Sequence, residues 1–144
     1  MSMDLSVGTD LDSLEREFAN RLERGDLPAV KPPDPLAPGD TCHYVSPVRF
    51  GRRRADQYGH LVLTGGWLKF RGTLDVSVSW SEVARVERMS REIVVSLEDS
   101  RRLLRFSCHS EAEAARGVLL AKHLARSARP YTAQPAAIGN QATL

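Results

Sequence analysis

Four arginines stand within six consecutive positions of the chain, at Arg49, Arg52, Arg53 and Arg54. A guanidinium group can donate two parallel hydrogen bonds to one phosphate or carboxylate, so arginines clustered in this way are typical of anion-binding loops. Lys69 and Arg71 add to this charge if the hairpins that carry them lie side by side. Each cation near an anionic membrane contributes about 1 kcal/mol, which predicts weak, salt-sensitive attachment. The alternative is a solvated loop held open by its own charge repulsion.

Two Cys-His dipeptides, Cys42-His43 and Cys108-His109, stand near the two ends of the central region. Together they hold the ligand types of a Cys₂His₂ zinc site. Neighbouring residues of a strand point to opposite faces, so the two members of one dipeptide would not readily reach one metal ion. We therefore expect no metal site, buried thiols and histidines on solvated faces. A disulfide between the two cysteines requires the strands that carry them to lie close together, which the sequence leaves open.

The residue types used in hydrolytic and acid–base catalysis are present but scattered. Serine, histidine and aspartate occur at no spacing typical of a nucleophile elbow, and no helix carries a pair of metal ligands at metalloprotease spacing. The acidic residues Glu92, Glu98 and Asp99 fall in or beside predicted turns, where carboxylates usually face water. We expect a protein that is not an enzyme and carries no cofactor.

Two apolar features could instead serve a protein partner. Residues 10–24 have the pattern of an amphipathic helix, whose apolar stripe consists of Leu11, Leu14, Phe18 and Leu22. A helix this short is marginal alone in water, so we expect it to be ordered only when docked on its own domain, on a partner helix or on a second copy. Trp67 falls on the polar face of its strand. It is either an exposed anchor for a partner or covered by this helix, and we favour the second.

The elements that must position these residues centre on Tyr58 to Trp80, which predicts three short strands. Apolar residues alternate with polar ones along it, at Leu61, Leu63, Leu68, Phe70, Leu74, Val76, Val78 and Trp80. This period of two indicates strands with one buried face and one wet face. Gly65-Gly66 supplies the positive φ angles that a two-residue hairpin turn requires.

Further elements flank this stretch. Residues 41–49 predict the first strand, and three later apolar segments predict strands near residues 83–86, 93–97 and 104–108. Ser110 followed by Glu113 forms a capping box that begins a helix over 110–128. Five prolines make residues 26–39 an extended spacer, while the start of the chain up to Val7 and a tail over 129–144 are expected to be loose.

At 144 residues the chain has room for one domain, which we place at residues 40–128, with the helix (residues 1–25) and spacer before it. A net charge of +2 argues against nucleic acid as the ligand. No apolar run approaches the roughly 20 residues of a spanning helix. The first residues lack the features of a secretory signal, and two cysteines give no disulfide framework. We expect a reduced, cytoplasmic setting.

The layout resembles the pleckstrin-homology-like (PH-like) superfold, and more narrowly its GRAM and bacterial PH-like families. The similarity covers residues 38–128 and begins with the Pro38-Gly39-Asp40 entry. The remaining motif positions are Gly59, Leu61, Leu63, Thr64, Leu68, Phe70, Trp80, Val83 and Val86. The resemblance implies a mainly β fold, a seven-stranded antiparallel barrel or sandwich closed by a C-terminal helix.

For function, we expect a non-enzymatic binding module that acts as a protein-interaction or adaptor domain. Its contact surfaces would be a sheet edge, Trp67 and the N-terminal helix, which leaves open a homo-oligomer formed through that helix. The partner protein is not identified by any motif. The alternative is a peripheral membrane module whose basic loop binds anionic lipid head groups.

Overall fold

The structure is a computed structural model that describes the backbone of residues 2–51 and 57–142, and the side chains of residues 11–51 and 57–128. Its elements in chain order are α1 (Ser2–Glu23), β1 (Cys42–Phe50), β2 (Gln57–Thr64), β3 (Trp67–Gly72), β4 (Val76–Ser79), the 3₁₀ turn η1 (Trp80–Glu82), β5 (Val83–Met89), β6 (Glu92–Leu97), β7 (Leu103–Ser107) and α2 (Glu111–Ala142).

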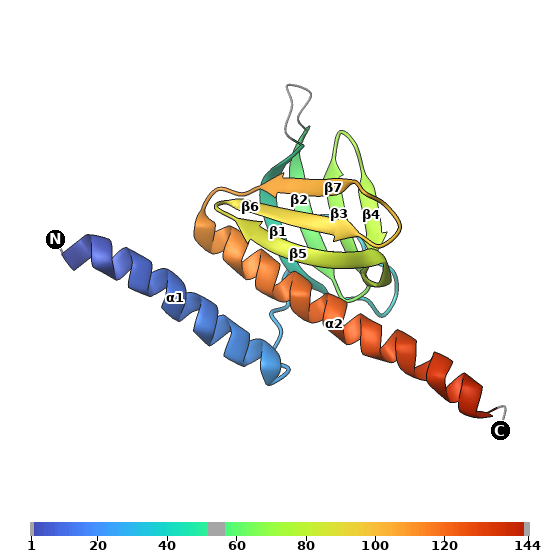
Figure 1. Cartoon of the computed structure of the whole chain (residues 1–144). Coiled ribbons are helices and arrows are strands. Elements are labelled where there is room, and N and C mark those ends of the chain that lie inside the picture. The colour runs from blue at the N-terminus through green and yellow to red at the C-terminus, as the bar shows by residue number, and fades with distance from the viewer. Residues whose placement is uncertain (1, 52–56, 143–144) are drawn as a thin grey trace.

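The strands form one antiparallel sheet of seven strands in the order β4-β3-β2-β1-β7-β6-β5. β1 and β7 are paired only where Arg49 lies opposite Ser107 and Phe50 opposite Phe106. Beyond this short seam the sheet folds over, so that β5, β6 and β7 cross in front of β1 to β4, and α2 runs along the open side (Figure 1). This arrangement confirms the predicted fold class, a mainly β, PH-like sandwich with an N-terminal and a C-terminal helix.

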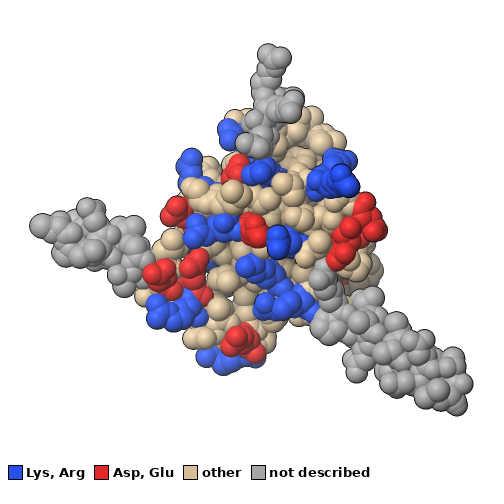
Figure 2. Space-filling model, viewed as in Figure 1, with Lys and Arg blue, Asp and Glu red and all other residues tan. Residues whose placement is uncertain are grey.

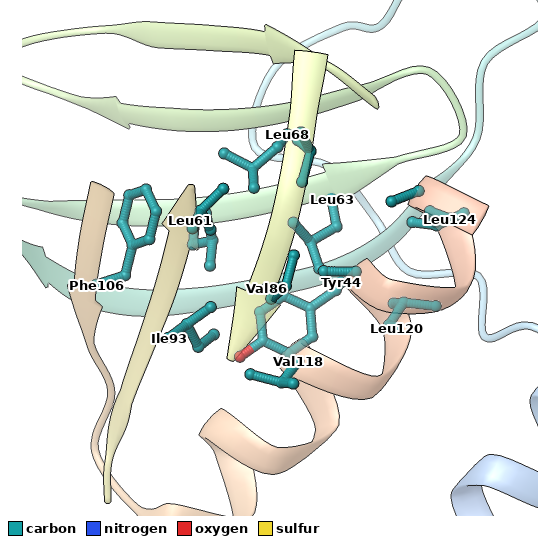
Figure 3. Close-up of a cluster of buried hydrophobic side chains, with 14 of the residues drawn as sticks. Tyr44, Leu61, Leu63, Leu68, Val86, Ile93, Phe106, Val118, Leu120 and Leu124 are labelled. Carbon is teal, nitrogen blue, oxygen red and sulfur yellow. The ribbon is translucent and has the colours of Figure 1, made fainter. Parts of the chain in front are cut away.

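The core lies between the two layers and α2. In β3, Leu68 and Phe70 are fully buried. Trp67 points to the opposite face of the strand and is exposed to solvent, which agrees with its place on the polar face of the alternating pattern. Figure 3 shows Leu61 and Leu63 of β2 converging with side chains of the opposite layer and of α2. Each fully buried side chain of this size contributes about 1.5–3 kcal/mol, so the hydrophobic core provides most of the stabilising free energy.

Small residues bring α2 close to the sheet. Ala114 and Ala121 are fully buried against it, and Gly117 faces Ile93 and the phenol of Tyr44. The Tyr44 hydroxyl donates a hydrogen bond to the Glu113 carbonyl oxygen (3.0 Å), which ties β1 to the first turn of the helix. α2 therefore sits where the sequence places it, directly on the apolar side of the sheet.

The predicted helix start is also confirmed. The Ser110 hydroxyl accepts a hydrogen bond from the Glu113 N–H (3.2 Å), as an N-cap residue does. The helix ends differ from prediction elsewhere: α1 begins at Ser2 instead of near Asp10, and α2 continues to Ala142 instead of giving way to a loose tail after residue 128. Apolar spacing marks the docked part of a helix and gives no signal for turns that continue beyond the contact.

A polar network closes the hairpin between β2 and β3. Asp40 accepts hydrogen bonds from the Thr64 hydroxyl (2.7 Å) and from the N–H groups of Thr41 (2.9 Å) and Gly66 (3.2 Å). The Thr64 hydroxyl oxygen in turn accepts a hydrogen bond from the Trp67 N–H (3.0 Å). The Pro-Gly-acidic entry and the Thr-Gly-Gly turn, which lie more than twenty residues apart, are therefore parts of one structure.

Trp80 is anchored at the same place. Its indole N–H donates a hydrogen bond to the Thr64 carbonyl oxygen (2.8 Å), and its ring is buried in the core.

Leu74 was expected to be buried as part of the predicted strand that also holds Val76 and Val78. It is exposed, because β4 begins only at Val76 and Leu74 lies in the turn before it.

We predict that Asp40→Ala lowers the free energy of unfolding by about 2 kcal/mol, since it removes an ionised acceptor from three hydrogen-bond donors. Urea denaturation measures this change. Asp99→Ala removes an exposed carboxylate in another turn, so it serves as the control and should stay within about 0.5 kcal/mol of the unmodified chain. Equal stability of the two variants would contradict the network's role.

Candidate functional site

The proline-rich segment lies along the outer face of β2 and β3. The Val30 N–H donates a hydrogen bond to the Cys42 carbonyl oxygen (2.9 Å), and His43 Nδ1 lies 2.7 Å from the Pro28 carbonyl oxygen. Val62 points outward from β2 but is only 2% exposed, since residues 33–36 lie over it. The segment that the sequence interprets as a spacer is thus fastened to the sheet at several points, and we call residues 28–40 the proline strap.

The proline strap supplies a counter-ion to Arg71. The Arg71 guanidinium donates a hydrogen bond from Nε to Asp34 (2.8 Å) and lies 3.4 Å from Asp75. The hydrogen bond to Asp34 and the charge of Asp75 raise the pKa of Arg71. Lys69 lies beside them at a small hollow of about 110 Å³ under the strap. Arg71 is therefore balanced by two carboxylates of the chain itself.

The arginine loop is described only at its first residue. Arg49 is exposed at the end of β1, while Arg52, Arg53 and Arg54 lie outside the described residues. Arg49 lines a shallow hollow of about 280 Å³ together with Tyr58, Arg91 and His109, residues that the loop hypothesis did not include. Anion binding by this loop stays a prediction.

Both cysteines are free and buried. Burial raises the pKa of the Cys108 thiol to about 11, although a hydrogen bond with Tyr44 opposes part of this shift. Burial likewise raises the pKa of Cys42. Over the part of the chain that the structure describes, no group of three or more His, Cys, Asp or Glu residues could hold a metal ion. His109 is exposed, and His43 is half-buried beside the proline strap.

We predict that the stability of the chain falls as the pH rises from about 9 to 11. The folded state holds the Cys108 proton up to a pKa of about 11, whereas the unfolded thiol loses it near the ordinary value of 9.0. The raised pKa thus contributes stability below pH 9 that is lost as the pH rises towards 11. Urea midpoints at pH 8 and pH 10.5 measure the loss. Cys108→Ala should show a shallower loss, and an equal loss in both chains would contradict this account.

α1 packs on α2 and not on the open sheet (Figure 1). Of its apolar stripe, Leu22 reaches the core, Leu11 and Phe18 are half-buried, and Leu14 is 44% exposed. The interpretation that α1 covers Trp67 is therefore wrong, since Trp67 remains 38% exposed on β3. The physical reason is that α2 offers a second apolar face, which the sequence pattern of α1 cannot distinguish from a sheet.

A further feature that the sequence did not reveal lies between β5 and α2. β5 ends the sheet, so it pairs with β6 along one edge only, and α2 borders the other edge. A hollow of about 270 Å³ opens there. It is lined by Val83, Ala84, Arg85, Val86, Glu87, Lys122, Ala125 and Arg126. The buried side chains of Val83, Val86 and Ala125 make its floor apolar.

A second hollow of about 400 Å³ continues the first towards α1. Its lining consists of Glu15, Glu87, Arg88, Ala115, Val118, Leu119 and Lys122. Glu87 and Lys122 border both hollows, which therefore form one elongated depression, named here the β5–α2 trough. Its walls come from β5, α2 and α1.

Charges around the trough are unevenly balanced. Arg85 lies 3.4 Å from Glu87, and Arg88 lies 3.7 Å from Glu15 of α1. Lys122 and Arg126 are exposed on α2, and among the described residues neither has a carboxylate within 4.0 Å. Figure 2 shows Lys and Arg side chains gathered where α2 passes below β5. The sequence shows that Lys122 and Arg126 are four residues apart in a predicted helix, but it does not show that they lie beside β5.

Neither described helix contains an 18-residue stretch apolar enough to cross a membrane. No protein-family model matches the sequence, and no curated protein matches it. Among solved structures, the C-terminal domain of an unknown protein from Leishmania infantum is similar, with 19% identity, a TM-score of 0.50, and coverage of 60% of this chain and 86% of that chain. Inner membrane complex sub-compartment protein 3 from Toxoplasma gondii gives 10% identity, a TM-score of 0.45, and coverage of 80% and 85%. The likeness to the Leishmania domain extends to the fold alone.

Proposed function

We propose that this chain is a non-enzymatic binding module, a cytoplasmic adaptor domain that holds an extended segment of a partner protein in the β5–α2 trough. The observation that carries the proposal is an edge strand bordered by a trough with an apolar floor. We also propose that the chain is a member of the GRAM family, which its sequence motifs resemble.

The backbone of β5 supplies the first part of the binding energy. A strand at the edge of a sheet presents N–H and C=O groups to which another extended chain can add. Such main-chain pairing contributes affinity without regard to sequence, while pockets beside the strand read alternate side chains. The buried Val83, Val86 and Ala125 give the trough a place for one apolar side chain of the added segment.

The composition of the trough favours binding over catalysis. Among the described residues that line it there is no Ser, Cys, His or Tyr, so none of these nucleophiles or bases comes from the described side chains of the lining. The charges that line it belong to Arg, Lys and Glu side chains, and two of the arginines face carboxylates. A surface of this kind orients a bound chain and does not activate it.

The basic β1–β2 loop supports the rival membrane function less strongly. Arg71, which would add to its field, faces Asp34 and Asp75. Trp67 is exposed and remains a second candidate contact for a protein partner. A test must therefore separate the trough from Trp67 and from Arg49.

The test begins with peptides of twelve residues selected from a random displayed library against the full chain. The strongest binder is then titrated into the isotope-labelled full chain while backbone amide shifts are followed. We predict shifts concentrated at residues 85–89 and 122–126, and at least a tenfold loss of affinity in Ala125→Phe, whose ring fills the trough.

Trp67→Ala is the matched control, since it alters an exposed aromatic side chain on β3, away from the trough, and should leave the affinity unchanged. Thermal unfolding checks that both variants fold. Shifts that concentrate around Trp67 or Arg49 instead, with binding unaffected by Ala125→Phe, would refute the trough as the binding site.

A further inference from the structure

We propose that the segment received by the β5–α2 trough is acidic, with two carboxylates at positions i and i+2 that meet Lys122 and Arg126. This inference rests on the proposed function and adds the chemistry of the partner. It depends on three observations, which are the lack of local carboxylates, the spacing of the two cations and the commitment of the neighbouring acids.

The first observation concerns the helix itself. After Glu113 the sequence contains no Asp or Glu up to its last residue, whereas it contains Arg116, Lys122, Arg126 and Arg129. Lys122 and Arg126 therefore have no acidic neighbour one turn further along α2. Like charges four residues apart on a helix repel each other. Two external carboxylates, one beside each cation, would offset this repulsion and add two attractive interactions.

The second observation concerns distance. Residues four apart on an α-helix are separated by about 6 Å along its axis. Residues two apart on an extended strand are separated by about 6.6 Å and point to the same side. Figure 1 shows β5 running alongside α2, so a strand added to β5 would also run along the helix. Carboxylates at i and i+2 thus match the spacing of Lys122 and Arg126, and the residue between them points away.

The third observation concerns the other charges of the trough. Glu87 faces Arg85, and Glu15 of α1 faces Arg88 (3.7 Å). The acids nearest to Lys122 are therefore each beside another cation. Glu15 also shows that a carboxylate brought to this trough by a separate element pairs with an arginine of β5. The charge left over at the trough is positive, and an acidic segment complements it.

Four synthetic peptides test the proposal, all with the same strand-forming frame of twelve residues. One carries Glu at i and i+2, one carries Gln at both positions, one carries Lys at both, and one carries Glu at i and i+1. Titration calorimetry with the full chain at 50 and 300 mM NaCl measures their affinities. We expect the i, i+2 acidic peptide to bind about tenfold more tightly than the Gln peptide at low salt, since each exposed ion pair contributes up to a factor of about five.

The charge-reversed chain with Lys122→Glu and Arg126→Glu should lose this advantage and bind the Lys peptide in preference. Arg101→Glu with Arg102→Glu is the matched control, because it makes the same change of charge at two exposed positions before β7 and should keep the preference for the acidic peptide. The i, i+1 peptide, whose carboxylates point to opposite sides, should bind no better than half-way between the acidic and the Gln peptides.

Three results would overturn the inference. If the Gln peptide binds the trough as tightly as the acidic one and the charge reversal has no effect, the acidic chemistry fails while the proposed binding module stands. If amide shifts show no peptide at residues 85–89 and 122–126, both fail together. If Lys122 and Arg126 govern sedimentation with vesicles of phosphatidylserine and phosphatidylcholine but not peptide binding, the partner is a membrane.

Discussion

A Cβ atom added to Gly117 would lie 2.7 Å from Ile93 Cδ1 and 3.0 Å from the Tyr44 hydroxyl oxygen, so α2 approaches the sheet as closely as a helix without a side chain allows. The depth of the core and the position of α2 relative to β5 both follow from this contact. The width of the β5–α2 trough is thus set on the opposite side of the helix, by the residues that seat it. A larger residue at this position would lift the helix and change the trough without touching its lining.

The distribution of charge follows from which segments dock on the sheet. The proline strap brings Asp34 to Arg71, and α1 brings Glu15 to Arg88, so each docked segment carries a carboxylate to an arginine of the sheet. α2 contains no acidic residue after Glu113. Among the described residues, Lys122 and Arg126 of this helix have no carboxylate within 4.0 Å, and neither has Lys69 of β3, whereas Arg71 of the same strand is paired.

The strands and the docked part of α2 could be predicted because their signals are local. Alternation around Leu68 and Phe70 reports one buried face, and the Ser110 hydroxyl caps the helix that follows within its own first turn. The Pro-Gly-acidic entry could be recognised as a motif, but its bond from Asp40 to Thr64 joins segments that only the folded chain brings together.

The trough could not be predicted because its two walls come from residues near 85 and near 125, which no local pattern relates. The prediction that α1 covers Trp67 failed for a similar reason. An apolar stripe indicates that a helix docks on another surface, but it does not indicate which surface. Here α1 docks on α2. The pairing of Arg71 with Asp34 could not be recognised, because Asp34 lies in a segment that has no periodicity.

The attachment of the proline strap has a consequence for α1. Pro28 is the first residue of the proline strap and is held to β1 at His43, so only residues 24–27 separate the strap from the last residue of α1. Four residues span at most about 14 Å even when fully extended, and here Arg24 to Asp26 turn back onto the end of α1. A tether of this length keeps the helix at a local concentration in the millimolar range or above beside α2, whatever the intrinsic strength of their contact. A second molecule that offers its own helix would have to outcompete that internal one, so exchange between copies requires the strap to detach first.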